Sequence, residues 1–335
     1  MKVAVTGGTG YLGAHTTRAL LADGHDIRLL VHPDESAAGV LSLFGAAAGR
    51  VEVLHGDIRD ADVVATLLDG CDAVLHAAGV VGTDNSRETL MWEVNTAATA
   101  TLLTRAAVLG LDPIVHVASY SALFPPPGRV IGPDSPTAPG RSAYGRTKAA
   151  ADRIARALQD AGAPVVITYP SSVVGPGLGG MRGVTATGWA PMVAAGVAPR
   201  MRGGMQMIDV RDVADVHAAV MRPGRGPRRY MCGGELIEFD ELIDILESAS
   251  GHRIKRIPLA PSVFRGIGRI ADALGAVLPV GAGLSYEAAW LLTAATPTDD
   301  SRTLSELGLT WRPVRAALSA SVRTPAPGSP EGVTP

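Results

Sequence analysis

The chain has 335 residues, of which 47% are apolar and 19% charged, so it can bury a sizeable core and global disorder is excluded. Its 30 basic residues against 32 acidic ones provide no net field that would attract nucleic acid or an anionic membrane. Two cysteines are too few for a disulfide framework and fit a reducing compartment. A strand pattern at the very N-terminus leaves no room for a signal peptide, and no apolar run is long enough to span a membrane. We therefore expect a soluble, cytoplasmic protein.

A glycine-rich turn follows the first predicted strand, Val3–Val5. Three glycines, Gly7, Gly10 and Gly13, have the spacing G-x-x-G-x-x-G, and a helical pattern then runs to Asp23. The first glycine permits a tight turn, the second lets the backbone approach a pyrophosphate, and the third lets the helix pack closely on its strand. The helix N-terminus offers free N–H groups to the phosphates. This order of strand, turn and helix predicts a dinucleotide site.

The second predicted strand, Ile27–Val31, ends at His32. An acidic side chain would hold the ribose hydroxyls of NAD at this place, but the nearest carboxylate in the sequence is Asp34. An imidazole could instead donate to the 2′-phosphate of NADP. We therefore expect NADP, with NAD as the alternative; His32 could also be an ordinary surface residue.

The next two predicted strands each end in a candidate cofactor contact. After the strand Val51–His55, Asp57 could accept a hydrogen bond from the adenine amino group, with Ile58 packed on the ring. Alternatively, Asp57 caps the following helix. The strand pattern 73–79 ends in small residues that would let a cofactor lie against the backbone.

Polar residues then accumulate around the fifth predicted strand, 113–118. A long helix, Ser86 to Leu109, precedes it and carries Asn95, a residue type that is usually a satisfied polar group at such a place. The strand ends in Ser119 and Ser121. Either hydroxyl would lie at the carboxyl end of a parallel strand, where ligands bind.

Tyr144 and Lys148 open the next predicted helix, which runs to about Ala161. They are four residues apart and therefore share one helical face. Only three lysines occur in the whole chain, so a function that needs a lysine near the middle falls on Lys148.

A sixth strand, Val165–Tyr169, completes an alternation of strands and helices that predicts an α/β fold, a doubly wound parallel (Rossmann) sheet with right-handed crossovers. We expect residues 1–174 to form the NAD(P)-binding domain, with 208–232 packing back on it. Residues 175–323 would form a smaller α+β substrate domain, and 324–335 a disordered tail.

The second half of the chain gives weaker signals. Glycine, methionine and Trp189 dominate residues 177–207, which we interpret as a mobile lid over an apolar substrate or, alternatively, as the core of the small domain. A helix from Phe239 is expected to be capped by Asp240, and 222–229 to be a surface loop. Apolar residues between Val263 and Val277 share one helical face that could be core, pocket lid or, as a minority interpretation, a membrane-surface contact. The histidines show no metal-ligand spacing.

Together these motifs resemble the extended short-chain dehydrogenase/reductases, that is, the NAD(P)-dependent epimerase/dehydratase superfamily. The resemblance covers residues 1–260 in order and is strongest to the dihydroflavonol-reductase-like and 3β-hydroxysteroid-dehydrogenase-like branch. Sugar-nucleotide epimerases tend to carry an Asn after the sixth strand, where this chain has Tyr169-Pro170-Ser171. The motifs that carry the resemblance are Thr6-Gly7-x-x-Gly10-x-x-Gly13, Gly56-Asp57-Ile58, His76-Ala77-Ala78, Asn95, Ser119-x-Ser121-Ala122, Tyr144-x-x-x-Lys148 and Pro170 to Pro176.

The resemblance implies roles for four residues. Tyr144 would donate its phenolic proton to a carbonyl oxygen, and Lys148 would lower the phenol's pKa and hold the nicotinamide ribose. Ser121, or failing that Ser119, would hydrogen-bond the same oxygen. Asn95 would hold a water that relays the proton. The residues expected to contact the cofactor are Gly7, Thr9, Gly10, Tyr11, Leu12, Gly13, His32, Asp57, Ile58, Ala77, Ala78, Lys148, Pro170 and Val173.

The expected function is therefore reduction of a ketone or aldehyde of an apolar small molecule, or the reverse oxidation, with NADP(H). The alternatives are a nucleotide-sugar epimerase or dehydratase, and a cofactor-bound redox sensor without catalysis. We expect a small-molecule carbonyl or alcohol substrate, no metal, no nucleic-acid partner and no integral membrane segment, and we allow for a homodimer.

Overall fold

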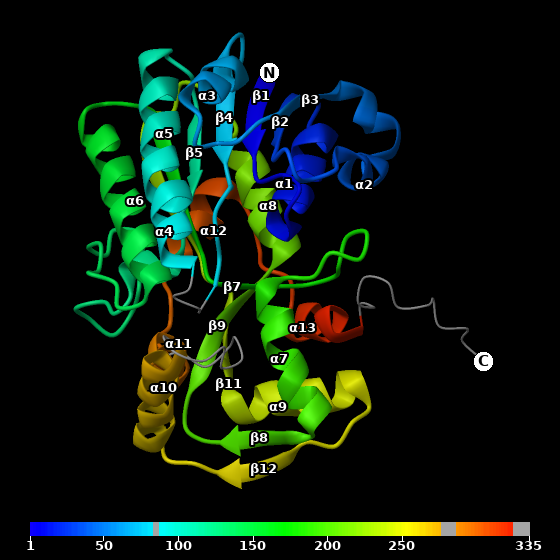
Figure 1. Cartoon of the computed structure of the whole chain (residues 1–335), viewed down its shortest axis with the longest axis vertical. Coiled ribbons are helices and arrows are strands. Elements are labelled where there is room, and N and C mark those ends of the chain that lie inside the picture. The colour runs from blue at the N-terminus through cyan, green and yellow to red at the C-terminus, as the bar shows by residue number, and fades with distance from the viewer. Residues whose placement is uncertain (83–86, 276–285, 324–335) are drawn as a thin grey trace.

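A computed structural model describes residues 1–82, 87–275 and 286–323. The chain forms two lobes, one above the other in Figure 1, with a large twisted sheet and its helices in the upper lobe. Over these ranges, no helix combines the length and the apolar character needed to cross a membrane. The tail 324–335, for which we expected disorder, lies outside the described residues.

The upper lobe is built on a seven-stranded parallel sheet with the order β10-β6-β5-β4-β1-β2-β3. This confirms the predicted doubly wound fold and all six predicted strands. The seventh strand comes from a segment where we expected a surface loop to extend to Arg229; that loop ends earlier, because Arg228 already pairs with Val166. The strands are β1 (Lys2–Thr6), β2 (Asp26–Val31), β3 (Val51–His55), β4 (Ala73–His76), β5 (Ile114–Val117), β6 (Val165–Pro170) and β10 (Arg228–Cys232).

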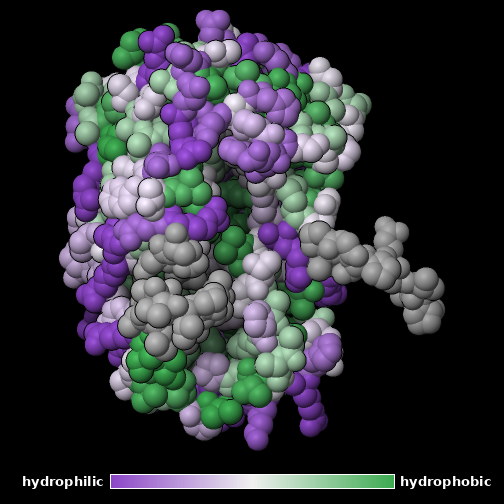
Figure 2. All heavy atoms as spheres, in the orientation of Figure 1, coloured by the Kyte–Doolittle hydropathy of each residue, from purple (hydrophilic) through white to green (hydrophobic). Residues whose placement is uncertain are grey.

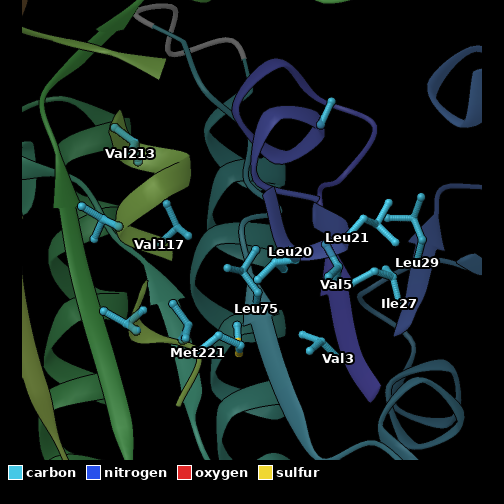
Figure 3. Packing of buried hydrophobic residues seen from close by; sticks show 14 of the residues in the cluster. Val3, Val5, Leu20, Leu21, Ile27, Leu29, Leu75, Val117, Val213 and Met221 are labelled. Atoms are coloured by element: carbon cyan, nitrogen blue, oxygen red, sulfur yellow. The ribbon is translucent and has the colours of Figure 1, made fainter. Parts of the chain in front are cut away.

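Helices cover both faces of this sheet. Because successive side chains of a strand point to opposite faces, each strand contributes to the core on both sides. Val3 and Val5 pack with Leu20 and Leu75 on one face, as Figure 3 shows, whereas Ala4 belongs to the core on the other face. The first face is covered by α1 (Tyr11–Ala22), α2 (Ala37–Ser42), α8 (Val210–Val220) and α12 (Ser301–Leu307). The second face is covered by α3 (Ala61–Leu68), α4 (Glu88–Met91), η3 (Trp92–Ala98), α5 (Thr99–Val108) and α6 (Ala143–Asp160).

The lower lobe has its own apolar core and two small sheets. One sheet joins β7 (Ser172–Val174), β9 (Gly204–Asp209) and β11 (Glu235–Glu238), and the other joins β8 (Val197–Arg200) and β12 (Lys255–Pro258). The helices are α7 (Val184–Ala195), α9 (Phe239–Ser250), α10 (Pro261–Gly275), α11 (Tyr286–Ala294) and α13 (Val314–Arg323). Short 3-10 turns occur at η1 (Gly45–Arg50) and η4 (Tyr120–Leu123).

Two details of the lower lobe differ from expectation. Helix α9 is preceded by Glu238 as its N-cap, so Asp240 lies inside the first turn and was wrongly predicted to cap it. The segment 177–207 contains regular structure, α7 and β8, and Met207 is fully buried in the lower core. Trp189 packs edge-to-face on Phe239 with ring centroids 6.3 Å apart. These contacts favour the core interpretation of this segment; the lid remains a prediction.

Candidate active site

The glycine turn between β1 and α1 is held by close backbone contacts that only glycine allows. Gly7 has a φ of 73°, and a Cβ atom there would lie 2.5 Å from the backbone nitrogen of Ala78. A Cβ at Gly13 would lie 2.0 Å from the carbonyl oxygen of Gly7. Gly10 is the N-cap of α1 and offers no side chain to the first free N–H groups of the helix. The turn therefore fits a pyrophosphate, which those N–H groups would bind.

Tyr11, at the start of α1, turns toward the lower lobe. A Cβ at Gly183 would lie 2.9 Å from its ring, and one at Gly175 would lie 3.3 Å from its hydroxyl. Burial, with Asp209 nearby, raises the pKa of the Tyr11 phenol well above its ordinary value. Leu12 packs against the core on the first face of the sheet. Cofactor contacts by these two residues remain predictions.

The end of β2 is surrounded by carboxylates. The Nδ1 atom of His32 lies 3.6 Å from Asp34 and its Nε2 atom 3.7 Å from Asp57. The hydroxyl of Thr9, in the glycine turn, donates to the carboxylate of Glu35 at 2.6 Å. Glu35 could not be recognised from the sequence, because it lies beyond the strand end and only the path of the folded chain brings it to the turn.

Asp57 is held as a carboxylate by its neighbour Arg59. The guanidinium donates to both carboxylate oxygens, and the backbone N–H donates as well, which lowers the pKa of Asp57 to about 2. Arg59 also binds Glu93 at 2.6 Å. The helix that follows is capped by Asp60, so capping does not account for Asp57. Ile58 is buried in the core. A bond from an adenine amino group to Asp57 remains a prediction.

A chain of hydrogen bonds fixes the corner after β4. The N–H of Ala78 donates to the hydroxyl of Thr6, which lies 2.7 Å from Nδ1 of His76. Nε2 of His76 lies 2.8 Å from the hydroxyl of Thr99, which itself donates to the carbonyl of Asn95. Because that hydroxyl has one proton, His76 must donate through Nε2 and accept at Nδ1. Burial lowers the pKa of His76 to about 3, which agrees with a neutral ring.

Asn95 links this corner to the helix that carries the Tyr/Lys pair. It lies in η3, a π-helical turn, and its side chain both accepts from the Val80 N–H at 2.7 Å and donates to the Val80 carbonyl. It also donates to the hydroxyl of Thr147 at 3.2 Å. These bonds show a structural role for the amide; the water relay remains a prediction.

Tyr144 and Lys148 lie on the first turns of α6, which Ser142 caps. The Lys148 ammonium is 6.0 Å from the centroid of the Tyr144 ring and donates to the carbonyl of Val117 at 3.3 Å. Burial lowers the pKa of Lys148 to about 8. A Cβ at Gly79 would lie 3.6 Å from the ammonium, so this glycine leaves the space beside it open. The lysine thus places its charge between the Tyr144 ring and the end of β5.

Both candidate serines are buried at the end of β5. The Ser121 hydroxyl donates to the Ser119 hydroxyl at 2.9 Å, and Ser119 also accepts from the Ser121 N–H. The two alternative serines are therefore one hydrogen-bonded pair, with Ser119 as the N-cap of η4 and Ser121 within η4, which packs against α6. Pro170 ends β6 and Val173 lies in β7, where the chain leaves the sheet.

The glycine turn, the corner after β4, the serine pair and the Tyr/Lys helix start all lie at the carboxyl ends of neighbouring parallel strands, where such sheets bind ligands. This arrangement defines a nucleotide-dependent enzyme of the Rossmann class. Residues 3–233 match the NAD dependent epimerase/dehydratase family, and the chain belongs to that family. The family consists of NAD(P)-dependent enzymes, among them epimerases, dehydratases and reductases, that act on small molecules.

Several known proteins are similar over nearly the whole chain. Sterol demethylase protein B of Methylococcus capsulatus is 30% identical over 331 residues, which cover 96% of this chain and 97% of that protein. A Synechocystis protein with the provisional name dihydroflavonol 4-reductase is 25% identical and covers 95% and 92%. Among solved structures, UDP-glucose 4-epimerase from Bifidobacterium longum, in complex with NAD+ and UDP, has a TM-score of 0.74 at 21% identity and covers 96% and 97%.

Proposed function

We propose that this protein interconverts an alcohol and a ketone or aldehyde on an apolar small molecule by hydride transfer, with Tyr144 as the acid and base. The observation that carries this proposal is the pairing of Tyr144 with a buried Lys148 beside the Ser119–Ser121 hydroxyl pair. These groups lie at the carboxyl end of β5, where η4 packs against α6 and Lys148 donates to the carbonyl of Val117.

The proposed chemistry follows from what these side chains can donate. A bound nicotinamide would supply or accept the hydride at the carbonyl carbon. Tyr144 would give its phenolic proton to the carbonyl oxygen, and Ser121 would turn its single hydroxyl proton from Ser119 to the same oxygen. Lowering the pKa of a phenol from about 10 to about 7 takes roughly 4 kcal/mol, which the nearby Lys148 ammonium would help to provide. The same ammonium would hold the nicotinamide ribose.

The proposal of an apolar substrate is supported by the name of a relative and by the side chains of the lower lobe. The Methylococcus relative, similar over its full length, is named for the demethylation of sterols, which are apolar polycyclic alcohols. The lower lobe presents apolar and sulfur-bearing side chains, with Trp189, Met192 and Met205 only partly buried against its core. We therefore favour a polycyclic or other bulky apolar alcohol as the substrate.

For the cofactor we propose NAD as the preferred form, which reverses the preference expected from position 32 alone. The 2′-phosphate of NADP carries two negative charges and would meet Glu35, Asp34 and Asp57 around the end of β2. The guanidinium of Arg59, which could otherwise bind that phosphate, is already bound to Asp57 and Glu93.

We also propose a cytoplasmic location and a homodimer. A cytoplasmic location is supported by the two cysteines, Cys71 and Cys232, which are both unpaired. A homodimer would be tested by the mass of the protein in solution.

The function is tested by incubating the purified protein with NAD+ or NADP+ and a panel of sterols, simpler secondary alcohols and UDP-sugars. Reduction of the free cofactor with a sterol or another bulky alcohol is the expected result, and Tyr144→Phe should slow it at least about 100-fold. Conversion of a UDP-sugar without net change in the cofactor would instead support the epimerase alternative. A protein that binds the cofactor but turns over none of these compounds would support the sensor alternative.

A further inference from the structure

Positive charge is concentrated at one end of the lower lobe, although the whole chain is balanced. Residues 251–271 contain five arginines and lysines and no acidic residue, and residues 196–203 add Arg200 and Arg202 without an acidic residue. The two segments meet because β8 and β12 pair in parallel. We call residues 196–203 and 251–271 the lobe tip.

Few of these charges are neutralised within the described part of the chain. Arg200 pairs with Asp240, and Arg256 pairs with Asp244 and Glu247 of α9. Among the described side chains, which do not include those of Asp272 and Glu287, no carboxylate forms an ion pair with the other five basic residues of the lobe tip. Three of these five are exposed on and beside β8 and β12. The five residues are Arg202, Arg253, Lys255, Arg265 and Arg269.

The same tip exposes aliphatic side chains. On α10, Val263, Ile267 and Ile270 follow helical spacing and are 51%, 41% and 61% exposed, whereas Phe264 is buried in the lower core. This stripe is therefore a face of α10 that the core does not use. Figure 2 shows hydrophobic residues gathered at the lower end of the molecule over α10, with hydrophilic side chains projecting from the same end.

The neighbouring two-stranded sheet has the same character. Alternate residues of a strand point to opposite faces, so Arg256 turns to the acidic residues of α9 while Lys255 and Ile257 turn outward. Lys255 lies opposite Val197 in the parallel register, and Val197 and Ile257 are 40% and 49% exposed. Both elements of the tip therefore combine exposed aliphatic groups with positive charge.

We propose that the lobe tip docks the protein on an anionic lipid surface. Aliphatic side chains would enter the boundary between headgroups and acyl chains, and the arginines and lysines would bind lipid phosphates, the two interactions that hold a peripheral protein on a membrane. A second copy of this chain is a poorer occupant, because a symmetric contact would bring two sets of positive charges together. Nucleic acid would bind the charges but would leave the aliphatic stripe in water.

The position of the tip links docking to the active site. Helix α10 packs against α11, and Trp290 of α11 packs edge-to-face on Phe124 with ring centroids 4.9 Å apart. Phe124 follows Ser121 by three residues. If the proposed function holds, an apolar substrate would enter from the lipid beside this contact. The docking itself does not depend on that function.

Docking is tested by floating the full-length protein with vesicles of phosphatidylcholine alone or mixed with phosphatidylglycerol. The wild-type protein should float with the mixed vesicles only, and added salt should weaken the binding. Two double variants separate the contributions, Ile267→Asp with Ile270→Asp and Arg253→Glu with Lys255→Glu. Each should weaken binding at least about tenfold.

Matched controls lie on the upper lobe. Val108→Asp with Leu109→Asp alters two exposed aliphatic side chains at the end of α5, and Arg222→Glu with Arg225→Glu alters two exposed arginines before β10. Both should bind vesicles like the wild type, and NADH binding in all variants checks that they are folded. The proposal is overturned if the wild type never floats, if the tip variants float as well as the controls, or if the tip variants change the mass of the protein in solution instead. Release of bound nucleic acid by the charge variant would also overturn it.

Discussion

The active-site end of the upper lobe and the tip of the lower lobe hold polar groups in opposite ways. At the active site, the buried side chains of His76 and Asn95 have hydrogen-bond partners for all their polar atoms. At the lobe tip, most of the arginines and Lys255 are exposed, and five of the seven basic residues have no carboxylate partner among the described side chains. Hydride and proton transfer need atoms fixed to fractions of an ångström, whereas contact with a variable surface needs charge and apolar area without fixed geometry.

The need for fixed geometry is greatest at the glycine turn, because there the backbone itself would bind the cofactor. Gly13→Val would place a side chain 2.0 Å from the carbonyl oxygen of Gly7, so α1 could not pack on β1. We expect a loss of at least about 4 kcal/mol in the free energy of unfolding, together with loss of NADH binding. Denaturant unfolding and fluorescence titration measure both. Gly39→Ala, where a Cβ meets nothing within 4 Å, is the control, and a Gly13→Val protein as stable as this control would contradict the assignment.

Removing the hydroxyl of Tyr144 should affect the catalytic rate and not cofactor binding. Tyr144→Phe should lower kcat by about 100- to 10,000-fold, because the proton donor is lost, and leave the Kd of NADH nearly unchanged. Steady-state kinetics and cofactor titration check this. Tyr230→Phe removes the hydroxyl of a buried tyrosine on β10 that donates to surface Glu306, away from the candidate active site, and should keep full activity. Comparable rates in the two variants would remove Tyr144 from the mechanism.

We expect the buried ammonium of Lys148 to lower the stability of the folded protein at neutral pH. Burial lowers the pKa of Lys148 from 10.5 to about 8, so between these values the unfolded chain binds more protons than the folded one. Stability should therefore rise with pH across that window, and below pH 8 the buried ammonium costs about 3 kcal/mol.

Lys148→Met should thus be more stable than the wild type at pH 7 by up to about 3 kcal/mol, while losing turnover. The difference should vanish as the pH approaches 10.5. Urea unfolding at several pH values measures it, with Lys255→Met on exposed β12 as the control. A Lys148→Met protein that is less stable at every pH would show that the bond to Val117 outweighs desolvation.

Features that depend on local sequence could be predicted, whereas contacts between distant segments could not. The glycine turn, the Tyr/Lys pair and six strands follow from local rules on clearance, helical spacing and buried apolar runs. Glu35 could not be found, because its contact with Thr9 depends on how the loop after β2 folds back over 26 positions. The basic tip was hidden by the balanced total charge, since two segments far apart in sequence meet only through β8 and β12. The hydrogen bond between Ser119 and Ser121 likewise could not be predicted, because it depends on the rotamers of the two side chains.

The smallest effect is expected at Glu35, the one fixed charge near the glycine turn that the sequence did not reveal. Its carboxylate accepts from Thr9 at 2.6 Å, so the negative charge lies on the turn that would receive the adenosine end of the cofactor. Glu35→Gln keeps the size of the side chain and an oxygen for Thr9 but removes the charge. We expect the Kd of NADPH to fall about fivefold to tenfold, a change of roughly 1 kcal/mol, with little change for NADH. The effect should shrink at high salt, because the group is exposed and screened. Glu52→Gln, a carboxylate on β3 that pairs with Lys2 and Arg28, is the matched control. If the wild-type protein already binds NADPH more tightly than NADH, the carboxylates do not decide the preference, and His32 becomes the residue to test by His32→Asp.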